Sequence, residues 1–162
     1  MILFFAGLLV AIPLWVVIEY IAHRWFMHAD GHLPHPIYYR RWESHMLHHG
    51  FGWQWKKAVH HYVDDGVSPA WNVVGSAPVW LLLGIYVSWS FAAAFVLVAF
   101  LHGVCWTAVH HEFHWPRDQW WSRNYLFGFM RRNHELHHQY PESNYAALFP
   151  PFMDLLFGTR RT

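Results

Sequence analysis

Two long apolar stretches alternate with two polar segments along the chain. Residues 1–22 are nearly all apolar and are long enough to cross a hydrocarbon core of about 30 Å as one helix. Residues 70–109 are also apolar, and as one helix they would extend about 60 Å, twice that thickness. We therefore expect a membrane hairpin that turns at Ser88-Trp89-Ser90, with two helices of about 17 to 19 residues. The alternative is a re-entrant pair that does not quite cross the membrane.

This pattern predicts a single domain of 162 residues with an all-α, integral membrane fold. We expect about three membrane helices and a histidine-rich helical lobe on the cytosolic side. The expected order is a membrane helix (1–22), a first His-rich segment (23–69), the membrane hairpin (70–109), and a second His-rich segment with a C-terminal docking segment (110–162).

Charge gives the expected orientation. All 11 Lys and Arg lie within residues 24–57 and 117–161, and neither the N-terminus nor the Ser88 turn has any. If the hairpin forms, both zones lie on one side, which the positive-inside rule makes cytoplasmic. An odd number of crossings follows, in a bacterial inner membrane or the endoplasmic reticulum. The formal net charge of +1 indicates no acidic or basic partner, and we expect no nucleic acid ligand.

Composition agrees with a membrane protein and draws attention to histidine. The chain is 55% hydrophobic and only 13% charged, a balance unlike that of soluble proteins. It has 16 His but only one cysteine, Cys105, which excludes an intrachain disulfide and a Cys-based zinc site.

Ten of the histidines form four clusters, since each of the two apolar stretches is followed by a pair and then by a triplet. The clusters are HX4H (His23, His28), HX2HH (His45, His48, His49), HX3H (His110, His114) and HX2HH (His134, His137, His138). Offsets of three and four residues place rings on one face of a helix. A pair five residues apart lies about 140° apart on an ideal helix, so the first pair cannot point both rings in one direction without distortion.

These clusters indicate a metal centre. Neutral imidazole is the commonest biological metal ligand, and ten imidazoles exceed the six ligands that an octahedral ion takes. The count suits two metal ions, whereas a structural zinc site needs four ligands. A nitrogen-rich set is compatible with Fe, Cu or Zn, and a membrane location with aromatic walls suits O2 activation against a buried C–H bond.

The other polar residues are less distinctive. We expect the lone His32, His35 and His102, and also His111 beside His110, not to be ligands. The doublet His60-His61 is compatible either with extra metal ligands or with side chains that contact the ligands from outside the metal site. Glu19, near the end of the first apolar stretch, is as compatible with a carboxylate that reaches the interface as with a functional group.

The motifs resemble the fatty acid hydroxylase/sterol desaturase superfamily. The four boxes have its order and spacing, and residues 144–159 (NYAALFPPFMDLLFGT) are similar to its closing segment. The resemblance implies that all ten clustered histidines are metal ligands. It also implies two iron ions, for which zinc can substitute on purification, and O2-dependent hydroxylation or desaturation of a lipid. Electrons would come from a separate cytochrome b5-like or ferredoxin-like partner. Asn133, Glu112 and Asn144 would orient the imidazoles, and Asp154 would fix the closing segment.

Several alternatives remain open from the sequence. The HX3H box is closer to the fatty acid 2-hydroxylase type, so we favour hydroxylation of a fatty acyl chain or sterol over desaturation. Residues 19–28 also resemble bacterial β-carotene ring hydroxylases. A non-catalytic membrane metal-binding or metal-transport protein is the rival from another class. The larger family members begin with an extra membrane hairpin, so we expect a minimal member or one completed by homodimerisation.

Overall fold

A computed structural model describes residues 1–28, 45, 48–49, 68–146, 148 and 151–162, and over these residues the chain is all-helical, as predicted. The helices are α1 (Ile2–Ile21), which continues into a π-helical turn (Ala22–Met27), α4 (Ser68–Gly75), α5 (Ala77–Tyr86), α6 (Trp89–His114), α7 (Tyr125–Gln139) and α8 (Phe152–Leu156). A short 3-10 turn, Trp120–Ser122, precedes α7.

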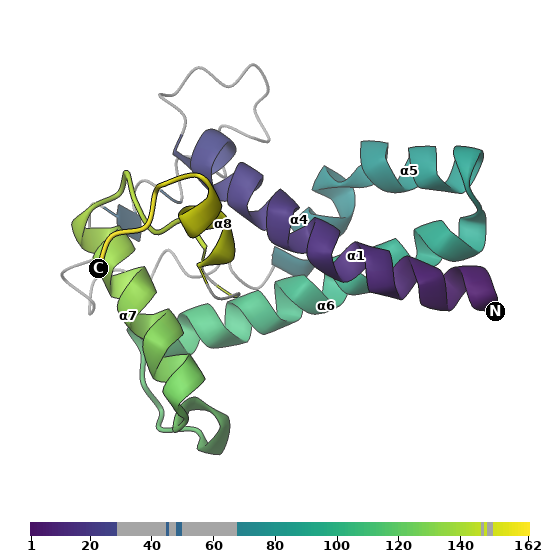
Figure 1. Cartoon of the computed structure of the whole chain (residues 1–162). Coiled ribbons are helices and arrows are strands. Elements are labelled where there is room, and N and C mark those ends of the chain that lie inside the picture. Colours follow the sequence, from purple (N-terminus) through teal and green to yellow (C-terminus); the bar gives the residue numbers. More distant parts are fainter. Residues whose placement is uncertain (29–44, 46–47, 50–67, 147, 149–150) are drawn as a thin grey trace.

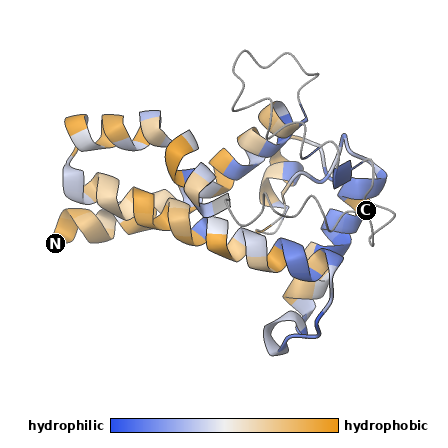
Figure 2. Ribbon diagram, turned by 180° about the vertical axis from the view of Figure 1, so that it is seen from behind, coloured by the Kyte–Doolittle hydropathy of each residue, from blue (hydrophilic) through white to orange (hydrophobic). Residues whose placement is uncertain are grey.

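The helices α1 and α6 pack along each other (Figure 1) and connect an apolar end to a polar end (Figure 2). The N-terminus and α5 lie at the apolar end, and α7, α8 and the C-terminus lie at the other (Figure 2). Within the described part of the chain, two continuous helical segments are long and apolar enough to cross a membrane, Ile2–Met27 and Trp89–His114. The apolar α5 is too short to do so alone.

The hairpin turns where the sequence predicts, but its first limb is not one helix. Helix α5 ends beside Ser88, whose hydroxyl caps α6 by accepting from the Phe91 N–H at 3.1 Å. The expected pair of 17 to 19 residues is wrong, because the first limb breaks at Ser76 and α6 is 26 residues long. The break has a covalent cause: Pro78 has no N–H, and its ring would collide with the Val74 carbonyl in a continuous helix.

Small residues allow the helices to approach closely. A Cβ on Gly7 of α1 would lie 2.8 Å from the Ala94 Cβ of α6. A Cβ on Gly103 of α6 would lie 2.5 Å from the Pro69 Cα of α4. Such contacts are typical of helix pairs in lipid, where van der Waals packing replaces the hydrophobic effect as the main attraction.

Most of the first predicted His-rich segment lies outside the described residues. Within it, the structure describes 23–28, His45, His48 and His49, and the start of α4. The expectations for His32, His35, His60 and His61 fall on residues that are not described.

The close contact at Gly103 generates a stability prediction. Replacing Gly103 by Ala forces a methyl group against the α4 backbone and should lower the unfolding free energy by roughly 1–3 kcal/mol. The same change at Gly128 in α7 meets no atom within 4 Å and should leave stability unchanged or raise it by up to about 1 kcal/mol. Thermal unfolding of both variants in detergent measures the difference. Equal midpoints would contradict the packing of α4 against α6.

Candidate metal centre

A π-helical turn overcomes the angular problem of the first histidine pair. Its defining hydrogen bond joins the His28 N–H to the His23 carbonyl at 3.2 Å, an i→i+5 connection. This wider turn brings a residue five positions later back over the first one. The two rings consequently lie 5.2 Å apart between centroids. The distortion that the HX4H spacing requires is therefore built into the end of α1.

All ten clustered histidines come together in two groups of five. The first group is His23, His28, His45, His49 and His137, and the second is His48, His110, His114, His134 and His138. Within each group, one ring nitrogen of every member lies within 4.8 Å of the others. The sequence thus predicted which histidines come together, and the structure adds how they are divided.

The two HX2HH triplets exchange their middle members. His45 and His49, one helical turn apart, belong to the first group, whereas His48 belongs to the second. On α7 the division is reversed, since His137 belongs to the first group and its two cluster neighbours to the second. Each group therefore needs residues from both His-rich segments.

The nitrogens of the first group are too crowded to satisfy one another. His45 Nε2 lies 3.1 Å from His23 Nε2, 3.0 Å from His28 Nε2 and 3.1 Å from His49 Nε2. A neutral ring nitrogen carries either one hydrogen or one lone pair, so three such contacts cannot all be hydrogen bonds. Nitrogens that share one metal ion at bond lengths of about 2.0–2.1 Å lie roughly 3 Å apart. The donor set fits a bound cation.

The second group shows the same crowding. His114 Nε2 lies 2.9 Å from His134 Nε2 and 3.2 Å from His110 Nε2, and His138 Nε2 lies 3.0 Å from His134 Nε2. The Trp106 ring stacks on His110 with centroids 4.3 Å apart and covers this group on one side.

Burial favours the neutral, metal-binding form of His28, His49, His134 and His137. Desolvation lowers the pKa of His28 from its ordinary value of 6.5 to about 4. Desolvation, and next the neighbouring His28, lower the pKa of His49 to about 2. Burial also lowers the pKa values of His134 and His137 well below the ordinary value, with repulsion from nearby histidines adding to the effect. Neutral imidazole keeps a lone pair for a metal ion.

Backbone carbonyls orient two rings of the first group. His23 Nδ1 contacts the Tyr145 carbonyl, and His137 Nδ1 contacts the Ser143 carbonyl at 2.6 Å. Since a carbonyl only accepts hydrogen bonds, Nδ1 carries the hydrogen in both rings. The lone pair is then on Nε2, the atom that faces the rest of the group.

The Tyr145 carbonyl belongs to the closing segment, Ser143 directly precedes that segment, and Asp154 holds the segment in place. The fully buried Asp154 carboxylate accepts from the Tyr145 N–H at 2.8 Å, the Ala146 N–H at 3.0 Å and the Thr159 hydroxyl at 2.8 Å. Asp154 thus has the structural role that its place in the sequence indicates, and it acts on the site through the backbone.

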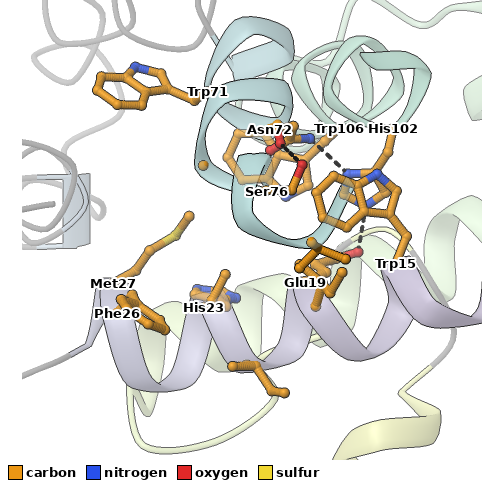
Figure 3. Close-up of a pocket in the computed structure, with 15 residues that line it drawn as sticks. Trp15, Glu19, His23, Phe26, Met27, Trp71, Asn72, Ser76, His102 and Trp106 are labelled. Carbon is orange, nitrogen blue, oxygen red and sulfur yellow. Dashed lines mark hydrogen bonds and ion pairs between the residues drawn. The ribbon is translucent and has the colours of Figure 1, made fainter. Parts of the chain in front are cut away.

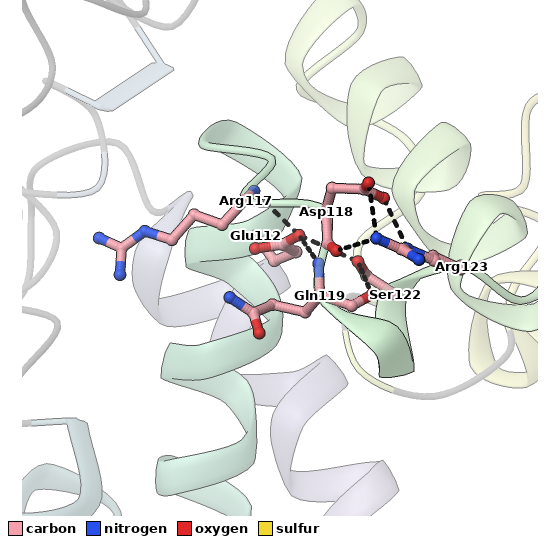
Figure 4. Close-up of polar contacts among 6 residues, drawn as sticks. All are labelled: Glu112, Arg117, Asp118, Gln119, Ser122 and Arg123. Atoms are coloured by element: carbon pink, nitrogen blue, oxygen red, sulfur yellow. Dashed lines mark hydrogen bonds and ion pairs between the residues drawn. The ribbon is translucent and has the colours of Figure 1, made fainter.

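The other side chains expected to orient imidazoles do not do so. Asn133 donates to the Ala146 carbonyl at 2.9 Å, and Asn144 exchanges hydrogen bonds with the Arg161 backbone at 2.7 and 3.1 Å. Glu112 holds the loop after α6 (Figure 4). One of its oxygens accepts from the Arg117 and Gln119 N–H groups and the Ser122 hydroxyl, at 3.0, 3.3 and 2.9 Å. The sequence could not show that carbonyls do this work, because every residue has one.

A cavity of about 270 Å³ lies beside the first group, between α1, α4 and α6 (Figure 3). It is lined by Trp15, Ile18, Glu19, Ile21, Ala22, His23, Phe26, Met27, Trp71, Asn72, Gly75, Ser76, Val79, His102 and Trp106. Most of this wall is apolar. His23 connects it to the first group, and Trp106, through its stacking on His110, connects it to the second.

Glu19, for which an interface position was one of two alternatives, is instead buried in that wall together with His102. Glu19 Oε2 lies 2.8 Å from His102 Nε2, with both side chains no more than 8% exposed. The second Glu19 oxygen accepts from the Leu148 N–H at 3.0 Å. The interpretation of Glu19 as a carboxylate reaching the interface is therefore wrong. His111, in contrast, lies outside both groups and stacks on Trp115.

The Asp154 contacts generate a second prediction. An Asp154→Asn change keeps the shape but turns an NH2 donor toward one of the two backbone N–H groups, and should lower the unfolding free energy by roughly 2–4 kcal/mol. Asp118→Asn, at a side chain 76% exposed, should cost no more than about 0.5 kcal/mol. Denaturation in detergent compares the two. An Asp154→Asn protein as stable as wild type would contradict the clamp.

Comparison with known proteins agrees with the site. No curated protein and no solved structure shows a significant match to the chain. A family model described as fatty acid hydroxylase matches residues 8–159, which include all four histidine boxes and the whole closing segment. Because this match spans nearly the whole chain, the protein belongs to the fatty acid hydroxylase family.

Proposed function

We propose that the protein is a membrane-embedded di-iron oxygenase that hydroxylates a C–H bond of a lipid, with the ten clustered histidines as metal ligands. The family implies an oxygenase-type enzyme acting on lipids. The observation that carries the proposal is the pair of five-histidine groups with mutually facing ring nitrogens. A site that needed only one structural ion would use about four ligands.

Each histidine group would hold one iron ion. When bound, the two ions supply the centre at which O2 is reduced, and zinc can occupy the same nitrogen-rich sites. Burial favours the neutral form of His28 and His49, and backbone carbonyls set the tautomers of His23 and His137. The aromatic wall of the cavity would keep water from the reacting C–H bond. Tautomer and burial are thus fixed before any substrate arrives.

The reaction needs components from outside the chain. One oxygen atom enters the C–H bond and the other leaves as water, which consumes two electrons and two protons. The sequence has no flavin, haem or nicotinamide motif, so the electrons would come from a cytochrome b5-like or ferredoxin-like donor.

The substrate would be a fatty acyl chain or sterol. A mostly apolar cavity that is lined by His23 of the first group, and by Trp106, which stacks on His110 of the second, suits a lipid body. Hydroxylation is favoured over desaturation by the HX3H spacing of His110 and His114, which is similar to that of fatty acid 2-hydroxylases.

Two helices of membrane-spanning length support an integral membrane location. With the broken limb α4–α5 as the third apolar element, the chain would pass with its polar end toward the cytoplasm, in a bacterial inner membrane or the endoplasmic reticulum. Its 162 residues would form one domain, with homodimerisation as a means of completing the membrane part.

Two other functions differ in what they require. A β-carotene ring hydroxylase would use the same metal centre on a different lipid, and product analysis separates the two. Metal transport requires polar groups spaced along a path through the spans. Here Glu19, His102 and Asn72 are joined to one another in a single cluster, which does not suit such a path.

The proposal predicts a sharp division among histidine variants. Purified protein in lipid nanodiscs, with ferrous iron, a reductant and ¹⁸O2, should place one labelled oxygen in a lipid product detected by mass spectrometry. Changing His48 or His137 to Ala removes a member of one group and should lower product formation more than about 100-fold. His111→Ala, adjacent to the centre but outside both groups, should retain activity. Persistent activity in the first two variants would refute the ligand assignment.

A further inference from the structure

We propose that the cavity beside the first histidine group selects a lipid that carries a hydroxyl group within its apolar body. The inference rests on the proposed function and deepens it by naming the substrate class. It is carried by two residues on one face of α1, Glu19 and Trp15, which line a wall that is otherwise mainly apolar (Figure 3).

A directed chain of hydrogen bonds fixes the acceptor. Asn72 Nδ2 donates to the Ala99 carbonyl at 3.2 Å, which identifies this atom as the amide nitrogen. The same nitrogen lies 3.2 Å from His102 Nδ1, so that ring nitrogen accepts and the ring hydrogen is on Nε2. His102 Nε2 then donates to Glu19 at 2.8 Å. The chain therefore ends at a carboxylate, which presents acceptor oxygens to the cavity wall.

Trp15 provides a donor in the same region. Its ring is 4% exposed, and its Nε1–H is buried with no acceptor among the described residues. It lies one helical turn before Glu19, and its ring contacts His102 with centroids 5.4 Å apart. A buried donor left unpaired lowers stability, so it indicates a group that the cavity binds.

A hydroxyl matches this pair, because it can donate to Glu19 and accept from Trp15 at once. A plain hydrocarbon chain would leave the Trp15 N–H unpaired and press methylene groups against a carboxylate. Trp15, Glu19 and His23 follow one another at four-residue spacing, so the hydroxyl would lie about 6 Å along α1 from the first group. The reacting carbon and the hydroxyl would thus be several carbon–carbon bonds apart.

Equilibrium binding tests the inference without turnover. Tritiated octadecanoate is compared with hydroxyoctadecanoates that carry the hydroxyl at successive chain positions, on detergent-purified wild-type protein without reductant. At one or a few adjacent positions, the hydroxyl should tighten binding at least about tenfold, as expected for a hydrogen bond to a charged group. Equal affinity for octadecanoate and every hydroxylated isomer would overturn the proposal.

Variants locate the effect. Trp15→Phe keeps the ring but removes the N–H, and Glu19→Gln keeps the shape but removes the charge. Each change should reduce the ratio of the affinity for the preferred hydroxyoctadecanoate to the affinity for octadecanoate toward one. Trp71→Phe, on the opposite wall, should leave the ratio unchanged. A ratio that survives both Trp15→Phe and Glu19→Gln would reject these residues as its source. Elemental analysis of each variant checks that metal content is retained.

The outcomes separate the two proposals. Hydroxyl preference without labelled product in the ¹⁸O2 assay would leave a lipid-binding site and reject the oxygenase function. Labelled product with no hydroxyl preference would support the oxygenase and reject the selection, so that Glu19–His102 would be only a tie between α1 and α6.

Discussion

The convergence of ten imidazole rings on two points is the constraint on which the arrangement depends. Ring nitrogens about 3 Å apart cannot satisfy one another, whereas a cation among them satisfies every lone pair. The constraint accounts for features that are otherwise costly. The π-helical turn after α1 sacrifices regular α-helical hydrogen bonding in order to place His23 and His28 together. The exchange of His48 and His137 makes each group depend on both halves of the chain.

The closing segment connects this centre to the helices. The Arg24 guanidinium donates to the Tyr20 hydroxyl at 2.8 Å, and Tyr20 contacts the Thr159 hydroxyl at 2.9 Å. Thr159 in turn donates to Asp154, which also accepts hydrogen bonds from the backbone N–H groups of Tyr145 and Ala146. A continuous polar chain thus runs from the end of α1 to the carbonyls that set the tautomers of two histidines. It explains why a segment that contributes no imidazole belongs to the site.

The sequence predicted what periodicity and side-chain chemistry encode. Helical periodicity and the length of the apolar stretches indicated the all-α fold and the turn at Ser88. The ten histidines were singled out because they are clustered at spacings that place several rings on one helix face. The helix break at Ser76 was not predicted, although Pro78 marks it, because the residues on both sides of Pro78 form one continuous apolar stretch. The carbonyls of Ser143 and Tyr145 have no sequence signature, and the Glu19–His102 pair joins residues 83 positions apart. The division of the triplets was also beyond prediction, since spacing fixes a helix face but not its neighbours.

The central claim is that this one chain holds two metal ions, one in each histidine group. The most direct measurement is the metal content per chain of wild-type protein, purified in detergent and reconstituted anaerobically with ferrous iron, by elemental analysis. The account predicts about two ions per chain, as iron or as zinc that has replaced it. One ion or none after reconstitution would contradict it, because the two groups of converging nitrogens would then lack the cations that their geometry requires.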